Sequence, residues 1–158
     1  MAYKEAMPRV HRSLFTAIAL ALAILSAGCS TVGFKREWRR AALGPESARP
    51  IEGRWQGTWL SDKNGHTGEL RCIISHTHGK NYRFDYWSSF WKVLRYRTTL
   101  NFRVVEQKDG SHQFTGAEDL GPVAGGVYEY EGAFKGDQFT ATYRNKYDHG
   151  TFQMRRVN

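Results

Sequence analysis

The sequence of 158 residues has little of what marks an enzyme or a membrane-spanning helix. It contains no recognisable nucleotide-binding motif, and no serine or cysteine stands in a recognisable nucleophile motif. Acidic residues are scarce, since 15 Asp and Glu stand against 23 Lys and Arg for a formal net charge of +8. No uncharged apolar run reaches the roughly 20 residues that a transmembrane helix needs. The sequence therefore predicts a basic, non-catalytic protein without a cofactor.

Two short motifs offer chemistry, but neither is complete. His76-x-His78 presents two imidazoles to a metal ion, yet the pair lies in a predicted turn and lacks a visible third ligand. Asp148 beside His149 could orient an imidazole for base catalysis, but hydrogen-bonded turn residues are far commoner. The sequence thus predicts no metal site and no catalytic residue.

The amino terminus has the layout of a secretory signal peptide. Basic residues within positions 1–13 precede an uncharged apolar run, Leu14–Gly28, that ends in small residues. Its end and Cys29 read Leu-Ser-Ala-Gly-Cys, which resembles the lipobox of bacterial lipoproteins, with Ser26 where leucine is usual. The resemblance implies cleavage before Cys29, a diacylglyceryl group on its thiol and a fatty acid such as palmitate on its new amine. Two or three acyl chains exceed the threshold for stable anchoring that a single chain misses.

The residue after this cysteine bears on location. Ser30 stands where an aspartate would imply retention in the inner membrane, so the resemblance favours the outer membrane and its periplasmic face. Residues 1–28 are therefore expected to be a signal peptide, and the rest a lipid-anchored protein of the bacterial cell envelope. Export separates such a protein from nucleic acid, which is not expected as a partner.

Cysteine chemistry follows from the anchor. With Cys29 lipidated, Cys72 is the remaining thiol and no internal disulfide can form. It lies between Leu70 and Ile74 on the apolar face of a predicted strand. We expect a small buried hydrophobic side chain, with a reactive or metal-binding thiol as the alternative.

Residues 29–50 are predicted to be a flexible tether. Pro45 and Pro50 block a continuous helix, and no alternating apolar pattern appears. The segment 34–40 holds four cations around two aromatic rings. Such a segment could lie on anionic lipid headgroups, which contribute about 1 kcal/mol per basic residue near the surface. A solvated linker is the alternative.

The body of the chain, residues 51–158, begins with a predicted hairpin. From Ile51 to Trp59 alternate residues are apolar or glycine, which is the period of a half-buried strand. Asn64-Gly65 is the pair that most readily forms a tight hairpin turn, and a second strand returns over residues 69–75.

Six further strands are expected at short, even spacing. Their patterns lie at residues 82–86, 94–104, 112–116, 128–134, 139–143 and 152–156. Residues 87–92 break the alternation and are interpreted as a bend or loop. Eight antiparallel strands with hairpin-like connections most economically close into an up-and-down β-barrel, which leaves no unpaired edge. The predicted fold class is therefore an all-β, eight-stranded antiparallel barrel.

Short motifs resemble known barrels. Gly53-x-Trp55 on the first predicted strand resembles the opening motif of lipocalins, and the segment 51–59 is also similar to the first strand of streptavidin-like barrels. The lipocalin resemblance implies that an arginine near the last strand covers the tryptophan; Arg156 and Arg155 are the two candidates. Residues 51–158 also resemble a type of bacterial lipoprotein domain without an assigned activity.

The interior of such a barrel decides between two functions. Fourteen aromatic residues are expected to point inward, and an eight-stranded barrel is just wide enough for its own side chains or one small ligand. In the first hypothesis the protein is a lipocalin-like binder of a small apolar or planar ligand, with candidate contacts at Trp59, Tyr86, Trp87, Phe90, Trp91 and Tyr96. In the second the barrel is filled, and a non-catalytic protein acts through its basic exterior on anionic envelope components. An interior cavity would favour the first.

Overall fold

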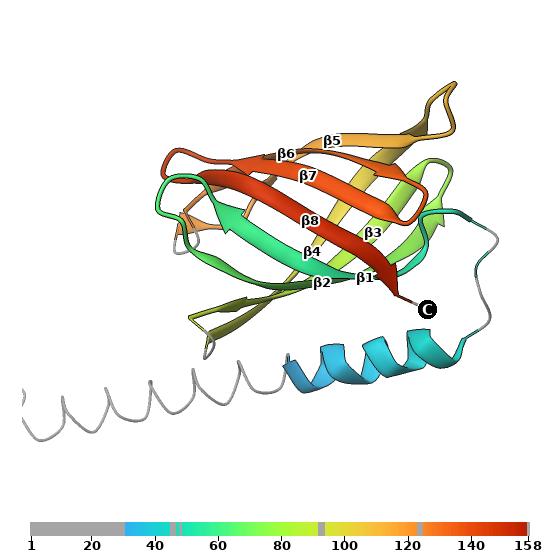
Figure 1. The fold of residues 1–158 in the computed structure, drawn as a ribbon, viewed down its shortest axis with the longest axis horizontal. Helices are drawn as coiled ribbons and strands as arrows, with labels where there is room; N and C mark the ends of the chain where they lie inside the picture. Colours follow the sequence, from blue (N-terminus) through green and yellow to red (C-terminus); the bar gives the residue numbers. More distant parts are fainter. Residues whose placement is uncertain (1–30, 45–46, 48, 92–93, 123–124, 158) are drawn as a thin grey trace, which may run out of the picture.

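The computed structural model describes residues 31–44, 47, 49–91, 94–122 and 125–157. The predicted signal peptide and Cys29 lie outside the described residues. The strands are β1 (Gly53–Ser61), β2 (Thr67–His78), β3 (Asn81–Phe90), β4 (Leu94–Glu106), β5 (His112–Asp119), β6 (Val127–Lys135), β7 (Gln138–Arg144) and β8 (His149–Val157). Each strand pairs antiparallel with the next, and β8 pairs with β1, so the sheet closes into an up-and-down barrel (Figure 1). The predicted fold class is confirmed.

Strand β1 shows why this sheet closes. Trp55 and Trp59 point inward and are buried, while the residues that follow each of them are exposed. Gly57 lies between the two indoles, and a Cβ atom there would stand 1.9 Å from the backbone oxygen of Gln153 on β8. Glycine therefore lets β8 approach β1 closely.

The chain reverses at Asn64-Gly65 as predicted, but only Gly65 takes a positive φ and the connection spans residues 62–66, wider than a two-residue hairpin turn. Gly65 has a φ of 72°, and its amide donates to the carbonyl of Ser61 at 2.9 Å. The Asn64 Oδ1 atom accepts a hydrogen bond from the amide of His66, also at 2.9 Å. Local hydrogen bonds and a positive φ thus reverse the chain within this connection.

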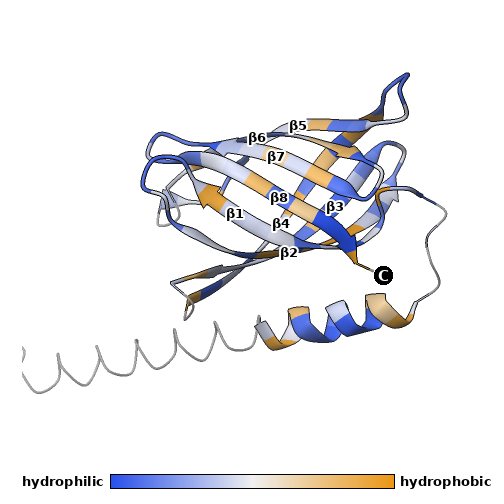
Figure 2. Cartoon of the chain, in the orientation of Figure 1, coloured by the Kyte–Doolittle hydropathy of each residue, from blue (hydrophilic) through white to orange (hydrophobic). Residues whose placement is uncertain are grey.

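One end of the barrel, where β1 begins and β8 ends, is filled with rings. Trp55 is fully buried, and its ring centroid lies 5.2 Å from that of Phe134 and 6.2 Å from that of Phe139. Phe84 and Phe114 pack against the same cluster, 5.2 Å from each other. Apolar residues alternate with polar ones along the strands, as the period of a sheet with one buried face requires (Figure 2).

Arg156 covers Trp55 at this end. Its Cζ atom lies 4.9 Å from the centre of the indole, and its Nη1 atom donates to the carbonyl of Glu52 at 2.6 Å. Its Nε atom lies 3.4 Å from a carboxylate oxygen of Asp137. Arg155 is exposed on the outer face. Of the two arginines considered from the sequence, Arg156 is the one that lies against the indole.

A helix over residues 31–43 corrects the expectation of a flexible tether. Both prolines, at positions 45 and 50, follow the end of the helix in the sequence and therefore do not interrupt it. The middle of the helix is mostly hydrophilic (Figure 2). Isolated helices shorter than about 12–15 residues are marginal in water, so packing on the barrel stabilises the helix over residues 31–43. Within the described residues, no helix has the length and apolar character needed to cross a bilayer.

Two rings and one carboxylate hold the helix against the outer face of the barrel. Phe34 is 1% exposed and stacks on Trp87 of β3, with 6.3 Å between the ring centroids. Glu37 forms an ion pair with Arg97 of β4, which also binds Asp85 of β3. Three arginines lie over rings: Arg97 over Phe34 at 5.7 Å, and Arg54 and Arg71 over Trp38 at 5.2 and 5.4 Å.

The same docking explains why the loop expected at residues 87–92 is wrong over residues 87–90. Strand β3 continues to Phe90, and Trp91 follows with a positive φ of 47°. Trp87 points outward and is buried beneath the helix. Both faces of β3 are covered at this point, so the apolar pattern no longer alternates.

Candidate functional site

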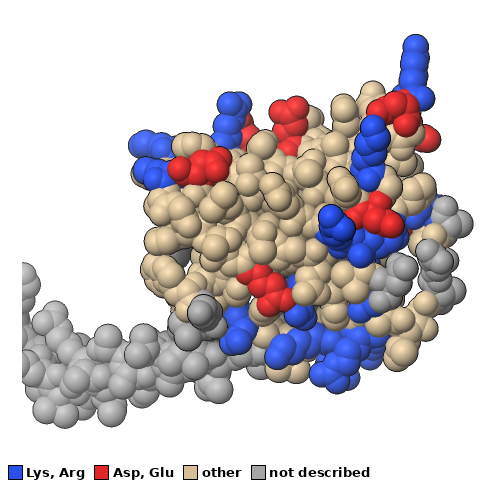
Figure 3. Space-filling model, in the orientation of Figure 1, with Lys and Arg blue, Asp and Glu red and all other residues tan. Residues whose placement is uncertain are grey.

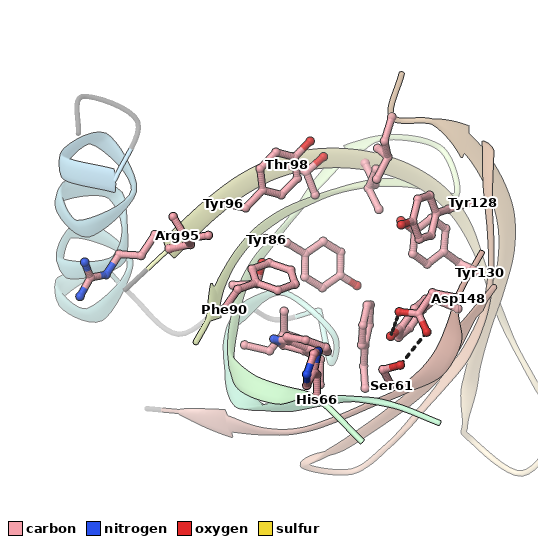
Figure 4. A pocket seen from close by; sticks show the side chains of 18 of the residues that line it. Ser61, His66, Tyr86, Phe90, Arg95, Tyr96, Thr98, Tyr128, Tyr130 and Asp148 are labelled. Atoms are coloured by element: carbon pink, nitrogen blue, oxygen red, sulfur yellow. Dashed lines mark hydrogen bonds between the residues drawn. The ribbon is translucent and has the colours of Figure 1, made fainter. Parts of the chain in front are cut away.

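The other end of the barrel contains a cavity of about 700 Å³ that is open to solvent on one side. It lies where the connections β1–β2, β3–β4, β5–β6 and β7–β8 gather. Most of its wall is aromatic or aliphatic (Figure 4). The lining apolar side chains are Trp59, Leu70, Tyr86, Phe90, Leu94, Tyr96, Leu100, Leu120, Tyr128, Tyr130, Tyr143 and Phe152.

Tyr86 forms the boundary between the filled end and the cavity. Its ring lies 6.1 Å from Phe84 in the packed core and 5.9 Å from Phe152 in the cavity wall. Burial raises the pKa of the Tyr86 phenol well above its usual value. The phenol therefore stays neutral near pH 7 and presents a hydroxyl at the cavity floor.

Four rings form a continuous wall on the side of β6, β7 and β8. Tyr143 and Phe152 are stacked with centroids 5.1 Å apart, and Tyr130 lies 6.4 Å from Phe152. Tyr128 completes the group at 6.2 Å from both Tyr130 and Tyr143. A wall of flat faces of this kind suits an apolar or planar ligand.

The sheet is interrupted beside the cavity. Strands β4 and β5 pair only over Arg103–Glu106 and His112–Thr115 within the described residues. The first part of β4 pairs with β3 alone, and the last part of β5 pairs with β6 alone. Tyr96 and Leu100 line the cavity from the part of β4 that pairs with β3 but not with β5. Strands β4 and β5 are therefore hydrogen-bonded to each other at the filled end of the barrel, and at the cavity end their backbones do not pair within the described residues.

A carboxylate stands in the cavity wall. Asp148 accepts a hydrogen bond from the hydroxyl of Ser61 at 2.6 Å and one from the hydroxyl of Tyr143 at 3.2 Å (Figure 4). Its backbone amide donates to the side chain of Asn145 at 2.6 Å, which anchors the β7–β8 connection. Burial, followed by the charge of Asp148, raises the pKa of Tyr143. The arrangement holds the carboxylate in place among rings.

Tyr130 offers an unused hydroxyl. Its phenol has no hydrogen-bond partner within the part of the chain that the structure describes, and it is 7% exposed. Burial is the first cause that raises its pKa, followed by the charges of neighbouring groups, so it stays protonated near pH 7. A neutral hydroxyl facing an empty volume can donate to a ligand.

Four of the six residues expected to contact a ligand line the cavity. These are Trp59, Tyr86, Phe90 and Tyr96. The other two do not: Trp87 lies outside the barrel, and Trp91 is 68% exposed with its ring 5.8 Å from that of His66. The error at Trp87 follows from the assumption that residues 87–92 form a loop, whereas Trp91 does lie in the turn after β3 but is exposed there.

Sequence reasoning missed the polar part of the cavity. Ser61 continues the inward alternation of Trp55 and Trp59, so a longer first strand would have placed it inside. Asp148 comes from a connection between strands, where alternation carries no information about direction. Nothing in the sequence pattern indicates that its carboxylate points at the rings.

The thiol of Cys72 and the imidazole of His76 do not form part of a reactive site among the described residues. Cys72 is fully buried, and burial raises the pKa of its thiol well above the usual value, which disfavours the nucleophilic thiolate. His76 and His78 lie at the end of strand β2 and not in the turn expected for them, and the Nε2 atom of His76 lies 2.9 Å from the carbonyl oxygen of Gly79. Among the described residues, no three His, Cys, Asp or Glu side chains gather as a metal ion would need.

Comparisons of the chain with protein-family models, with curated proteins and with solved structures find no match.

Proposed function

We propose that this chain is a lipid-anchored, non-catalytic protein of the bacterial cell envelope that binds a small, largely apolar ligand inside its barrel. The cavity of about 700 Å³ carries the proposal. Small-molecule pockets typically measure about 300–1,000 Å³ and have mostly apolar walls with a few polar groups. A barrel that served only as a scaffold would have its interior packed along its whole length, as the end around Trp55 is.

The sequence supports the anchoring half of the proposal. The lipobox-like residues ending at Cys29 lie outside the described residues, and residue 31, two positions later in the sequence, is the first described residue of the helix. Two residues of extended chain span at most about 7 Å. An acylated Cys29 would therefore hold the start of the helix close to the bilayer.

The exposed face of the helix fits an anionic surface. Lys35, Arg36, Arg39 and Arg40 are all exposed, and none of them forms an ion pair within the described residues. Glu37, the acidic residue of this helix, is turned toward Arg97 on the barrel. Lys and Arg side chains gather along the lower edge of the molecule, where the helix lies (Figure 3). Anionic headgroups would add about 1 kcal/mol for each basic residue near the surface.

The direction of the helix would place the mouth of the cavity near the membrane. Its first turns lie below the β3–β4 hairpin, which belongs to the cavity end of the barrel (Figure 1). Phe34 packs there against Trp87, while Trp38 in the next turn contacts Arg54 near the filled end. A ligand that partitions into the bilayer would then have a short path to the cavity.

Ligand binding is tested with a neutral planar probe and a matched pair of variants. The full chain in phosphatidylcholine nanodiscs, with empty nanodiscs as background, is titrated with N-phenyl-1-naphthylamine. Thr98→Phe fills the cavity, whereas Thr140→Phe adds the same ring to the exposed face of β7. Probe fluorescence should rise with the wild type and with Thr140→Phe but not with Thr98→Phe. Equal signals from both variants would refute binding in the cavity.

Anchoring is tested separately. Cells labelled with an alkynyl fatty acid should tag the wild type and not Cys29→Ala. Equal labelling of the two chains would remove the lipid anchor from the proposal.

A further inference from the structure

The charges that face the cavity have one sign, although the protein as a whole is basic. Asp148 lies in the wall, and no ion pair joins it to a Lys or Arg within the described residues. Glu118 of β5 is half-buried on the strand face that carries Phe114, opposite Tyr128. The charge of Glu118 contributes to the raised pKa of Tyr130, so the Glu118 carboxylate lies close enough to act on this cavity-lining phenol.

Arg95 and Lys63, two cations at the cavity end of the barrel, do not direct their charges into the cavity. Arg95 is the one Lys or Arg among the described cavity-lining residues, and its guanidinium points away from the cavity (Figure 4). Lys63 donates to the carbonyl of Tyr147 at 2.7 Å, on the outside of the mouth. The imidazole of His66 is the remaining basic group of the described lining. The carboxylate of Asp148 therefore has no Lys or Arg partner inside the cavity among the described residues.

Asp148 retains capacity for one more partner. An ionised carboxylate can accept about four hydrogen bonds. Ser61 and the amide of His149 use one oxygen, at 2.6 and 2.9 Å, and Tyr143 makes the longer bond of 3.2 Å to the other. The oxygen next to Tyr143 is thus the less satisfied one, and it stands beside the four-ring wall of Tyr128, Tyr130, Tyr143 and Phe152.

Rings and an unbalanced carboxylate together select a particular chemistry. The faces of aromatic rings carry negative quadrupole density and attract cations, most strongly where water is excluded. A carboxylate in the same partly buried space attracts a cation further and repels an anion, and the neutral hydroxyl of Tyr130 does not offset that repulsion between like charges.

We propose that the ligand is an organic cation: an apolar body carrying an ammonium group that lies between Asp148 and the four-ring wall. This inference depends on the proposed function, because it names the ligand class of the same cavity. The hydroxyl of Tyr130 remains to hydrogen-bond a further polar atom of the ligand. A carboxylate or phosphate amphiphile of the same size is excluded from the cavity.

Three probes with one apolar body test the charge rule. The full chain in phosphatidylcholine nanodiscs is titrated with 4-phenylbutyltrimethylammonium, 4-phenylbutan-1-ol and 4-phenylbutanoate, and tryptophan fluorescence is followed against empty nanodiscs. The cation should bind at least about tenfold more tightly than the alcohol. The carboxylate should bind more weakly than the alcohol.

Variants assign the preference to Asp148. Asp148→Asn keeps the shape and an acceptor for Ser61 but removes the charge, so the cation should lose about tenfold in affinity while the alcohol stays unchanged. Glu131→Gln removes an exposed carboxylate from the outer face of β6 and should leave all three affinities unchanged. If Asp148→Asn fails to fold by circular dichroism, Glu118→Gln replaces it, with a smaller loss for the cation expected.

The outcomes separate the two proposals. Binding of the alcohol or the carboxylate as tight as that of the cation overturns the ligand class and leaves ligand binding in place. An unchanged cation preference in a folded Asp148→Asn variant also overturns it, because the charge would then not come from this carboxylate. No binding of any probe, together with no signal from the neutral naphthylamine, overturns the proposed function itself.

Discussion

Replacing Trp55 with alanine should destabilise the barrel severely. Trp55 is 0% exposed, touches Phe134 and Phe139, and donates from Nε1 to the carbonyl of Ile51 at 3.0 Å. Removing a buried tryptophan typically costs about 3–5 kcal/mol. The carbonyl left without its donor adds about 1 kcal/mol.

Arg156 should be energetically coupled to Trp55. Its guanidinium lies 4.9 Å from the indole centre, and a partly desolvated cation over an indole contributes about 1–2 kcal/mol. The hydrogen bond to the Glu52 carbonyl at 2.6 Å is charge-assisted and adds about 1.5–3 kcal/mol. Arg156→Ala should therefore cost about 2.5–5 kcal/mol, of which the part that depends on the indole appears as coupling in a double-mutant cycle.

Urea unfolding followed by far-UV circular dichroism measures these free energies without depending on the tryptophan that is removed. Arg155→Ala is the matched control, because Arg155 is the exposed neighbour on the same strand, and it should change the free energy of unfolding by less than about 0.5 kcal/mol. The reasoning is refuted if Trp55→Ala unfolds at the wild-type urea concentration. It is also refuted if Arg156→Ala behaves like Arg155→Ala, or if the cycle shows no coupling.

Three further predictions concern the helix, the alkaline limit and the closure of the sheet. Phe34→Ala should release the helix from the barrel, so that amide hydrogen exchange over residues 31–43 becomes faster while the amides of the barrel stay protected. Lys35→Ala, on the exposed face of the helix, is the control. Equal exchange rates in the two variants would contradict the docking of the helix through Phe34. Burial raises the pKa of the Tyr86 phenol above its ordinary 10.0. Above that pH the unfolded chain loses the phenol proton before the folded chain does, so the free energy of unfolding should fall as pH rises. In urea titrations Tyr86→Phe should make this fall shallower between about pH 9 and 11. Gly57→Ala should cost about 1–3 kcal/mol or more because its Cβ would meet the β8 backbone at 1.9 Å, whereas thermal melting of Thr58→Ala on the outer face should match the wild type.

Much of the barrel could be predicted because alternation is a local property. Side chains of a strand point to opposite faces in turn, so the spacing of Trp55 and Trp59 already places both inside. The same parity puts Arg156 inward beside Trp55 and Arg155 outward once β8 is paired with β1. Turn chemistry is local too, and Asn64-Gly65 reverses the chain through its own hydrogen bonds.

The sequence by itself therefore determined the number of strands, their inward faces and the closed sheet. The tertiary structure alone decided where the barrel is solid and where it is hollow, because that depends on how rings from distant strands interdigitate. Trp55, Phe134 and Phe139 fill one end, whereas similar rings at the other end line a wall around open volume. It also decided that Trp87 lies outside, since only the docked helix gives the outer face of β3 something apolar to contact. The direction of the Asp148 carboxylate depends on a loop held by Ser61 and Tyr143, contacts that no local pattern encodes.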